Sequence, residues 1–464
     1  MAKQMHLNAF TQCCVNHHSK GQWKNPLTRS TDGYRNVHYW TELARTLERG
    51  LFDSLFLADV HGTYSVYKGS ARTAIEQAVQ IPGGDPTLII SAMAAATQHL
   101  GFACTFSTSY FPPYHTAKLF STLDHLTGGR VGWNVVTSYL ADALANFGLK
   151  DELTHDQRYD RADEYMSVVY KLWEHSWEDN AIVRDRVRDI YTDPDRVHKI
   201  DHEGAWFNVP GPHMCEPSPQ RTPVIYQAGA SGRGNAFAAR HAEAIFCIHP
   251  HIAAAAKDVK KVREAVVQAG RSPGDIKIIQ GVAVIVAPTD EEARLKEQTF
   301  RSFSNAEGVL ALFCGWAGID ISALPPGTRL EDCEWKAIQG LRGFFSNVDP
   351  DRDWTLEAIS DFMAIGSIFP KIVGSPQAVA DELERWIDEA DVDGFNIHAV
   401  TQPTGFSDFV DLVVPELQRR GRMRTSYEGS TLRESYFGAG NQRLSKTHPA
   451  YQALPPWKFG PLHS

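Results

Sequence analysis

The chain has 464 residues, of which 43% are hydrophobic and 22% are charged, and its formal net charge is −9. This balance is typical of a globular protein, so it excludes a largely disordered chain. The negative charge argues against a nucleic-acid partner held by a broad basic surface. No apolar run reaches the ~18 residues of a membrane span, and Met1–His6 lacks an apolar signal core. We therefore expect a cytoplasmic protein without a membrane partner.

Strand and helix patterns alternate along the chain. In chain order we predict the strand Met5–Phe10, helix Tyr39–Arg49, strand Asp53–Asp59, helix Asp85–His99, strand Gly101–Ser109, helix Thr116–Leu126, strand Arg130–Ser138, helix Arg158–Trp173 and a hairpin over Val197–Pro210. The second half continues with the strand Thr222–Ala228, helix Gly234–His241, strand Ala244–His249, helix Ile252–Ala269, strand Ile276–Ala287, helix Asp290–Ser302, helix Pro376–Ala390, strand Gly394–Val400 and helix Phe406–Arg420. The count gives eight strand-then-helix units.

Eight such units with strands that are apolar throughout favour an α/β fold, a (β/α)8 TIM barrel with insertions. An open, doubly wound sheet is the alternative. Residues 303–370 are rich in Gly, Pro, Phe and Trp and break the period, which indicates a lid. We therefore expect one barrel domain over residues 1–435, with the insertion 303–370 as its lid, and an extended C-terminal tail over 436–464.

The seven cysteines are scattered and form no Cys-x-x-Cys pair. This argues against a zinc ribbon or a thioredoxin-type site and fits a reducing cytoplasm. The nineteen histidines do not form the helical zinc motif either, and no Gly-x-Ser-x-Gly elbow is present. We expect no metal site and no serine hydrolase.

Polar and aromatic side chains follow the predicted strands. In a TIM barrel the reactive face lies at the C-terminal ends of the strands. That rule selects Asn8, Phe10, Asp59, His61, Thr105, Ser107, Tyr110, Asn134, Thr137, Ser138, Gln227, Gly229, Ser231, His249 and His398.

Some of these candidates, and a pair of residues at a helix start, have two interpretations each. Asp59 either accepts a hydrogen bond from a ligand or caps loop backbone, and Asn134 pairs either with a ligand or with a neighbouring loop. His155 and Tyr159 share one face at a helix start, where phosphate is favoured, or are a surface histidine and a packing tyrosine. The glycine-rich turn Gln227–Gly234 is compatible with an anion-binding nest but lacks the Gly-x-Gly-x-x-Gly spacing of a dinucleotide fold.

Eight segments together resemble one known family. They are Leu7–Phe10, Ala44–Asp53, Phe56–Asp59, Ser121–Thr127, Gly129–Ser138, His155–Asp160, Glu216–Arg221 and Gln227–Ser231. The chain resembles the bacterial-luciferase-like, flavin-dependent monooxygenases, in the branch of the nitrilotriacetate, dibenzothiophene-sulfone and dimethyl-sulfide monooxygenases. The resemblance covers about residues 5–435.

The resemblance implies an FMN site at the strand ends of the barrel. The family's contacts to the flavin ring and ribityl chain fall on Asp59, Thr105 and Asn134, and those around the phosphate fall on His155, Tyr159 and Ser231. Phe10 and His17 match the loop near the reactive face of the flavin and are our predicted catalytic residues, with His18 as the alternative to His17.

The resemblance also implies the reaction and the partners. Reduced FMN (FMNH2), supplied by a separate NAD(P)H:FMN oxidoreductase, and O2 as co-substrate would oxidise a small organic substrate such as a sulfide, sulfone, aminopolycarboxylate or halo-aromatic. This branch forms dimers or tetramers, so we expect a homodimer or homotetramer. Two alternatives are a flavin-degrading lyase on the same scaffold and a non-catalytic flavin-binding barrel.

Overall fold

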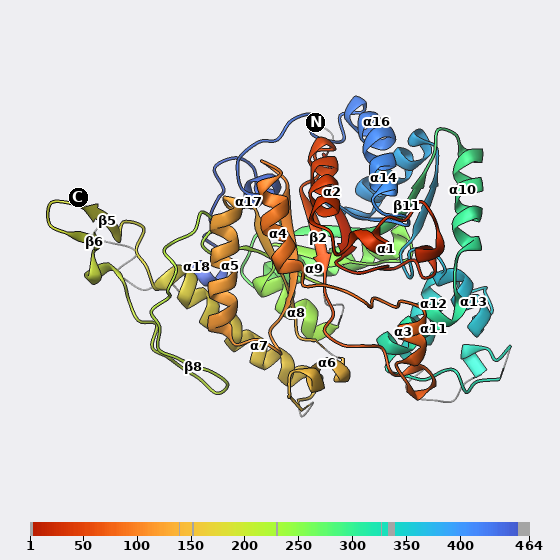
Figure 1. Cartoon of the computed structure of the whole chain (residues 1–464), viewed down its shortest axis with the longest axis horizontal. Coiled ribbons are helices and arrows are strands. Elements are labelled where there is room, and N and C mark those ends of the chain that lie inside the picture. The colour runs from red at the N-terminus through yellow and green to blue at the C-terminus, as the bar shows by residue number, and fades with distance from the viewer. Residues whose placement is uncertain are drawn as a thin grey trace.

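The computed structural model describes residues 3–138, 140–150, 153–228, 231–325, 327–332 and 339–452 (Figure 1). Its centre is a closed ring of parallel strands. The ring consists of β1 (His6–Gln12), β2 (Ser54–Ala58), β3 (Gly101–Ser107), β4 (Val131–Val136), β9 (Val224–Gln227), β10 (Ala244–Cys247), β11 (Lys277–Val286) and β13 (Gly394–Ala399). The pairing of β1 with β13 and of β10 with β11 closes it. The predicted TIM barrel is confirmed and the open sheet is excluded.

Helices surround the ring because the strands are buried on both faces. They are α2 (Val37–Arg49), α4 (Pro86–Ala95), α5 (Pro113–Thr127), α7 (His155–Tyr170), α8 (Gly232–His241), α9 (Ile252–Gln268), α10 (Asp290–Ser302), α14 (Pro376–Ala390), α15 (Thr404–Asp408) and α16 (Val414–Arg419). The shorter α1 (Ser30–Gly33), α3 (Arg72–Glu76) and α6 (Ala141–Asn146) lie in the loops. The predicted helix Asp85–His99 is four residues too long, because α4 ends at Ala95.

Two antiparallel hairpins leave the barrel between α7 and β9. One is β5 (Ile182–Asp185) with β6 (Ile190–Thr192), and the other is β7 (His202–Glu203) with β8 (Asn208–Val209). The second hairpin was predicted from the sequence and the first was not. Figure 1 shows both projecting to one side of the barrel.

The described part of the insertion 303–370 consists of helices joined by loops. It contains α11 (Ala306–Ala317), α12 (Gln339–Val348) and α13 (Leu356–Met363), and it leads to the short strand β12 (Lys371–Gly374), which pairs with β11. Figure 1 shows these helices gathered beside α3. Buried side chains of α11 and α13 form a second small core with the loop after β2, which includes Tyr64 and Tyr67.

The chain returns to the opposite end of the barrel in α17 (Leu432–Phe437), and α18 (Pro449–Gln452) follows. Leu432 and Tyr436 enter the interior of the barrel, where the Tyr436 hydroxyl donates to Asn8 Oδ1 over 2.8 Å. A Cβ on Gly101 would lie 2.5 Å from the Leu432 side chain, so glycine at this position allows the close approach. α17 therefore plugs the N-terminal end, and the boundary expected between residues 435 and 436 falls inside it.

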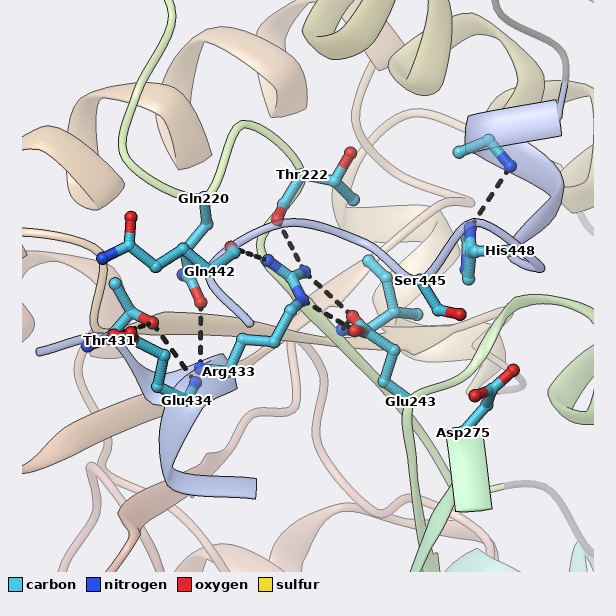
Figure 2. A network of polar contacts seen from close by, with 12 residues as sticks. Gln220, Thr222, Glu243, Asp275, Thr431, Arg433, Glu434, Gln442, Ser445 and His448 are labelled. Carbon is cyan, nitrogen blue, oxygen red and sulfur yellow. Dashed lines mark hydrogen bonds and ion pairs between the residues drawn. The ribbon is translucent and has the colours of Figure 1, made fainter. Parts of the chain in front are cut away.

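A buried ion pair fastens this plug to the barrel (Figure 2). Arg433 Nε donates to Glu243 Oε1 over 2.7 Å, and Arg433 Nη2 donates to Glu243 Oε2 over 2.9 Å. Both side chains are almost completely buried. Of the predicted tail 436–464, residues 453–464 lie outside the described residues.

Candidate functional site

A cavity of about 460 Å³ opens at the C-terminal ends of β1 to β4 and β9. Its volume lies within the ~300–1,000 Å³ that small-molecule sites occupy. The described residues that line it are Phe10, Gln12, His17, His18, Ala58, Asp59, Val60, His61, Tyr64, Gln80, Thr105, Ser107, Tyr110, Val135, Val136, Thr137, Ser138, Leu140, His155, Arg158, Tyr159, Gln227, Ala228, Ser231 and Trp316.

Two helix N-termini meet at one end of this cavity. His155, Arg158 and Tyr159 lie in the first turns of α7, and Ser231 is the N-cap residue of α8. Ser231 Oγ accepts a hydrogen bond from Gly234 N over 3.0 Å, so its own hydroxyl proton can still be donated. Free N–H groups and the helix dipoles favour an anion here.

The middle of the cavity is bounded by β3 and β4. Asn134 Nδ2 donates to Thr105 Oγ1 over 2.8 Å, which leaves the Thr105 hydroxyl proton for the cavity side. Asn134 itself lies behind Thr105, and its buried Oδ1 has no hydrogen-bond partner among the described residues. A buried amide oxygen without a partner is costly, and a bound ligand would remove that cost.

Asp59 supplies a carboxyl group at the end of β2. Its Oδ1 accepts from Val60 N over 2.9 Å, and its Oδ2 lies 3.3 Å from His61 Nε2. Burial raises the pKa of this carboxyl to about 7, against the lowering effect of the Val60 N–H and with help from the charge of Asp85. Asp59 is therefore able both to accept and to donate a hydrogen bond near neutral pH.

His17 and His18 lie side by side on the inner wall next to Phe10, with their rings tilted by 50°. Their ring centroids are 4.0 Å apart, and the Phe10 ring lies 4.6 Å from His17 and 5.5 Å from His18. Burial, together with the neighbouring histidines, holds the pKa of both imidazoles well below the usual 6.5. Both rings are thus neutral, and their buried Nδ1 atoms have no hydrogen-bond partner in the described structure.

A further histidine supports this pair from behind. The ring of His398, at the end of β13, lies 6.0 Å from His17, and its Nε2 lies 3.1 Å from Ser19 Oγ. Ser19 Oγ also accepts from Gly366 N at the end of the insertion over 3.1 Å. This contact joins the first loop, the last strand and the insertion.

Every predicted site residue lies at this cavity or directly behind it. Phe10, His17, Asp59, Thr105, His155, Tyr159 and Ser231 line it, and Asn134 contacts Thr105. Two other candidates were wrong for this site, because Asn8 faces α17 at the opposite end and His249 lines a separate cavity. Gly229 lies outside the described residues.

Several lining residues were singled out neither by the strand-end rule nor by the resemblance, among them five from loops and helices. Tyr64 and Gln80 come from the loop after β2, Leu140 from the loop after β4, Arg158 from α7 and Trp316 from α11. Only Arg158 stood within a quoted motif, between His155 and Tyr159. Trp316 is fixed in place by its helix, because Cys314–Ala317 are helical and Gly315 packs against the Tyr64 ring.

Comparison with known proteins identifies the scaffold. The family model described as luciferase-like monooxygenase matches residues 13–393. The chain belongs to this family. It is 47% identical over 452 residues to the dimethyl-sulfide monooxygenase of Hyphomicrobium sulfonivorans, covering 97% of this chain and 94% of that one.

Solved structures agree with this assignment. The crystal structure of long-chain alkane monooxygenase (LadA) is 48% identical, with a TM-score of 0.90 over 97% of this chain and all of that chain. A riboflavin lyase solved with modified FMN and riboflavin is 34% identical, with a TM-score of 0.89 over 98% of this chain and all of that one.

The predicted branch and the prediction of a monooxygenase are both confirmed. A dibenzothiophene-sulfone monooxygenase of Rhodococcus erythropolis is 38% identical, and nitrilotriacetate monooxygenase component A of Aminobacter aminovorans is 37% identical. No helix in the described part of the chain combines the length and apolarity that a membrane crossing requires.

Proposed function

We propose that the chain is the oxygenase component of a two-component, FMNH2-dependent monooxygenase. The observation that carries this is one cavity with an anion-binding end at α7 and α8 and a pair of neutral histidines on its inner wall. Substrate, O2 and FMNH2 would give the singly oxygenated product, FMN and water. Reduced FMN supplies the electrons that activate dioxygen when it is bound.

The described residues fit this cofactor. Tyr159, Ser231 and Arg158 would hold the phosphate, with His155 at the rim. Thr105 and Asp59 would hydrogen-bond the ribityl chain and the ring, and the unpartnered Asn134 Oδ1 gives that region a free acceptor.

The same cavity provides for the reacting oxygen. Phe10 packs against His17 and His18 and shields them from water, which strengthens electrostatic contacts in the site. A neutral imidazole in that position would hold or move a proton at the reacting oxygen.

The dependence on a reductase is the direct test of this function. Purified protein with FMN, NADH and a neutral sulfide should form almost no product, and a separate NAD(P)H:FMN oxidoreductase should restore turnover, because the chain has no nicotinamide fingerprint. Product is measured by mass spectrometry, with the reductase alone as control. NADH oxidation at turnover rates by the chain alone would contradict the two-component assignment.

A flavin-degrading lyase is the second candidate, because the riboflavin lyase covers this chain almost completely at 34% identity. The same assay separates the two functions. Loss of riboflavin or FMN with formation of flavin fragments would identify the lyase, whereas a monooxygenase returns FMN intact.

Phosphate recognition gives a second prediction. Tyr159→Phe and Ser231→Ala should each weaken FMN binding by roughly 1.5–3 kcal/mol, which is the cost of losing a hydrogen bond to a charged group. Calorimetric titration with FMN measures this. Riboflavin, which lacks the phosphate, serves as the control, and its weaker binding should not change in either variant. Equal affinity of the unchanged protein for FMN and riboflavin would refute the phosphate assignment.

We also propose that residues 303–370 act as a lid. Trp316 reaches the cavity, and its ring lies 5.5 Å from that of His18, so the insertion already covers the site. Limited proteolysis should cut this segment in the free protein, and FMN with substrate should suppress the cuts. Cleavage that ligand does not change would instead indicate a static insert.

We also propose that the protein is cytoplasmic and assembles with copies of itself. The six cysteines that the structure describes are free thiols, which supports the reducing cytoplasm. Apolar side chains are exposed on the two projecting hairpins, where Val187 is 96% exposed and Trp206 is 41% exposed, and they support a homodimer or homotetramer.

A further inference from the structure

The C-terminal end of β10 opens into a second cavity, of about 740 Å³, which the proposed reaction does not use. Residues of β10, α9 and α12 line this cavity, and Ala228 lines both this cavity and the first one. Three of its lining residues form a cluster, namely Cys247 at the end of β10, His249 just after it and Asp258 on α9. A thiol, an imidazole and a carboxylate within one cavity are groups that can activate a nucleophile.

Hydrogen bonds hold the His249 ring in its charged form. Its Nε2 lies 3.0 Å from Asp258 Oδ2, and its Nδ1 lies 3.0 Å from Gln280 Oε1. The orientation of the Gln280 amide is fixed, because its Nε2 donates to the carbonyl of Gly281 over 2.9 Å and to that of His249 over 3.2 Å. Both ring nitrogens therefore face acceptors and carry protons. Burial acts to lower the pKa of His249, but its contacts with Asp258, Cys247 and Gln280 raise it to about 10.

The Cys247 side chain lies against this charged ring. Its Sγ lies 3.7 Å from the Gln280 oxygen that faces the ring, and the His249 side chain makes a hydrogen bond to it. Lys257 and Lys261 line the same cavity, and its described lining residues include a single carboxylate. A neighbouring imidazolium and net positive surroundings stabilise a thiolate, which is the form of cysteine that attacks electrophiles.

The other described cysteines lack this combination. Burial raises the pKa of the thiol in four of them, which are Cys13, Cys14, Cys104 and Cys314. Cys215 is partly exposed, as Cys247 is, but its sulfur lies 3.9 Å from the carbonyl of Lys118 and burial raises the pKa of its thiol too. Among the described cysteines, partial exposure and a hydrogen-bonded imidazolium therefore occur together at Cys247.

We infer that Cys247 is a redox-sensitive thiol, activated by the His249–Asp258 pair, which hydrogen peroxide converts to a sulfenic acid. The sulfur attacks one peroxide oxygen, so that an S–O bond forms and the O–O bond breaks. The sulfur is oxidised and the peroxide is reduced, and the leaving hydroxide takes a proton from the His249 imidazolium to become water. This inference goes beyond the proposed function and does not depend on it.

Alkylation of the purified full chain measures the reactivity of each thiol. With iodoacetamide at pH 7, Cys247 should react at least ~10-fold faster than Cys215, which is the control within the same molecule. His249→Asn removes the imidazolium, and Asp258→Asn removes the carboxylate that favours its charged form. Each variant should slow the reaction of Cys247 at least ~5-fold and leave that of Cys215 unchanged, as read by peptide mass spectrometry. Unfolding exposes thiols and speeds their reaction, so a misfolded variant cannot imitate this selective decrease.

Peroxide then tests the oxidation itself. The full chain is treated with hydrogen peroxide and with dimedone, which traps sulfenic acids, and the label should appear at Cys247 and not at Cys215. Cys247→Ser should abolish the label, and His249→Asn should reduce it. Equal labelling of Cys247 and Cys215, or an unchanged reaction of Cys247 in His249→Asn, would overturn the inference. Neither result would affect the proposed monooxygenase, which is tested by its dependence on the reductase.

Discussion

Replacing Arg433 with methionine should lower the free energy of unfolding by about 3–5 kcal/mol, which is the cost of breaking a buried ion pair by removing one partner. The guanidinium donates to both carboxylate oxygens of Glu243 and to the carbonyl of Thr222, and it is 1% exposed (Figure 2). Methionine fills much of the same volume, so the loss of stability comes mainly from the buried, unpaired charge of Glu243 and only to a small extent from an empty space.

The pH dependence of this loss follows from Glu243. Burial alone would raise the pKa of the Glu243 carboxyl, but Arg433 holds it below its ordinary value. A carboxyl with a lowered pKa contributes stability above its unfolded pKa of ~4.3, and this contribution disappears as the pH falls through the folded value. In Arg433→Met only burial acts strongly on this carboxyl, so its folded pKa should lie above the ordinary value. The difference between the unchanged protein and Arg433→Met should therefore be largest at neutral pH and should shrink as the pH falls through the range between the two folded pKa values.

Arg443 offers a matched control. It lies ten residues further along and pairs with Asp179 over 3.2 Å, but its side chain is 43% exposed and that of Asp179 is 74% exposed. Arg443→Met should cost at most about 1 kcal/mol, as is usual for a surface pair. Both variants are measured by urea unfolding. If they cost the same, the Arg433–Glu243 pair does not hold α17 in place.

The sequence predicted the barrel because its signals are local. The ring strands are mainly apolar and the helices between them repeat with the helical period, so each segment can be interpreted without its neighbours. β12 (Lys371–Gly374) was missed because four residues carry no clear periodicity. α17 carried a readable signal, since Thr431 and Glu434 form a capping box, but no local pattern shows that it plugs the barrel.

The site divides in the same way. Asp59, Thr105 and Asn134 could be found because they stand at strand ends, and parallel strands bring their ends together. Tyr64 and Trp316 could not be found from the sequence, because they line the cavity only when α11 packs against the loop after β2. The lowered pKa of His17 could not be predicted from the sequence either. A free imidazole has a pKa of ~6.5, and burial in the folded protein lowers the pKa of His17 well below that value.

Replacing His17 with alanine should reduce product formation about 10²-fold, the low end for losing a general acid or base. Because its pKa is lowered, the His17 imidazole is neutral. It therefore acts as a hydrogen-bond partner that can relay a proton, and it does not supply a positive charge. Without it, reduced FMN and oxygen should yield hydrogen peroxide in place of product. FMN affinity should remain, because the phosphate end lies on α7 and α8.

His18 provides the comparison within the same pair. Its ring also contacts Phe10 and Trp316, so His18→Ala removes a similar ring from the same wall. His17→Asn keeps a polar side chain at position 17 and separates loss of packing from loss of the imidazole. Product and peroxide are measured together at several pH values between 6 and 8, where a neutral imidazole predicts little change in rate from titration of His17. If His17→Ala and His18→Ala both keep full coupled turnover, neither histidine serves the reacting oxygen, and solvent must supply the proton.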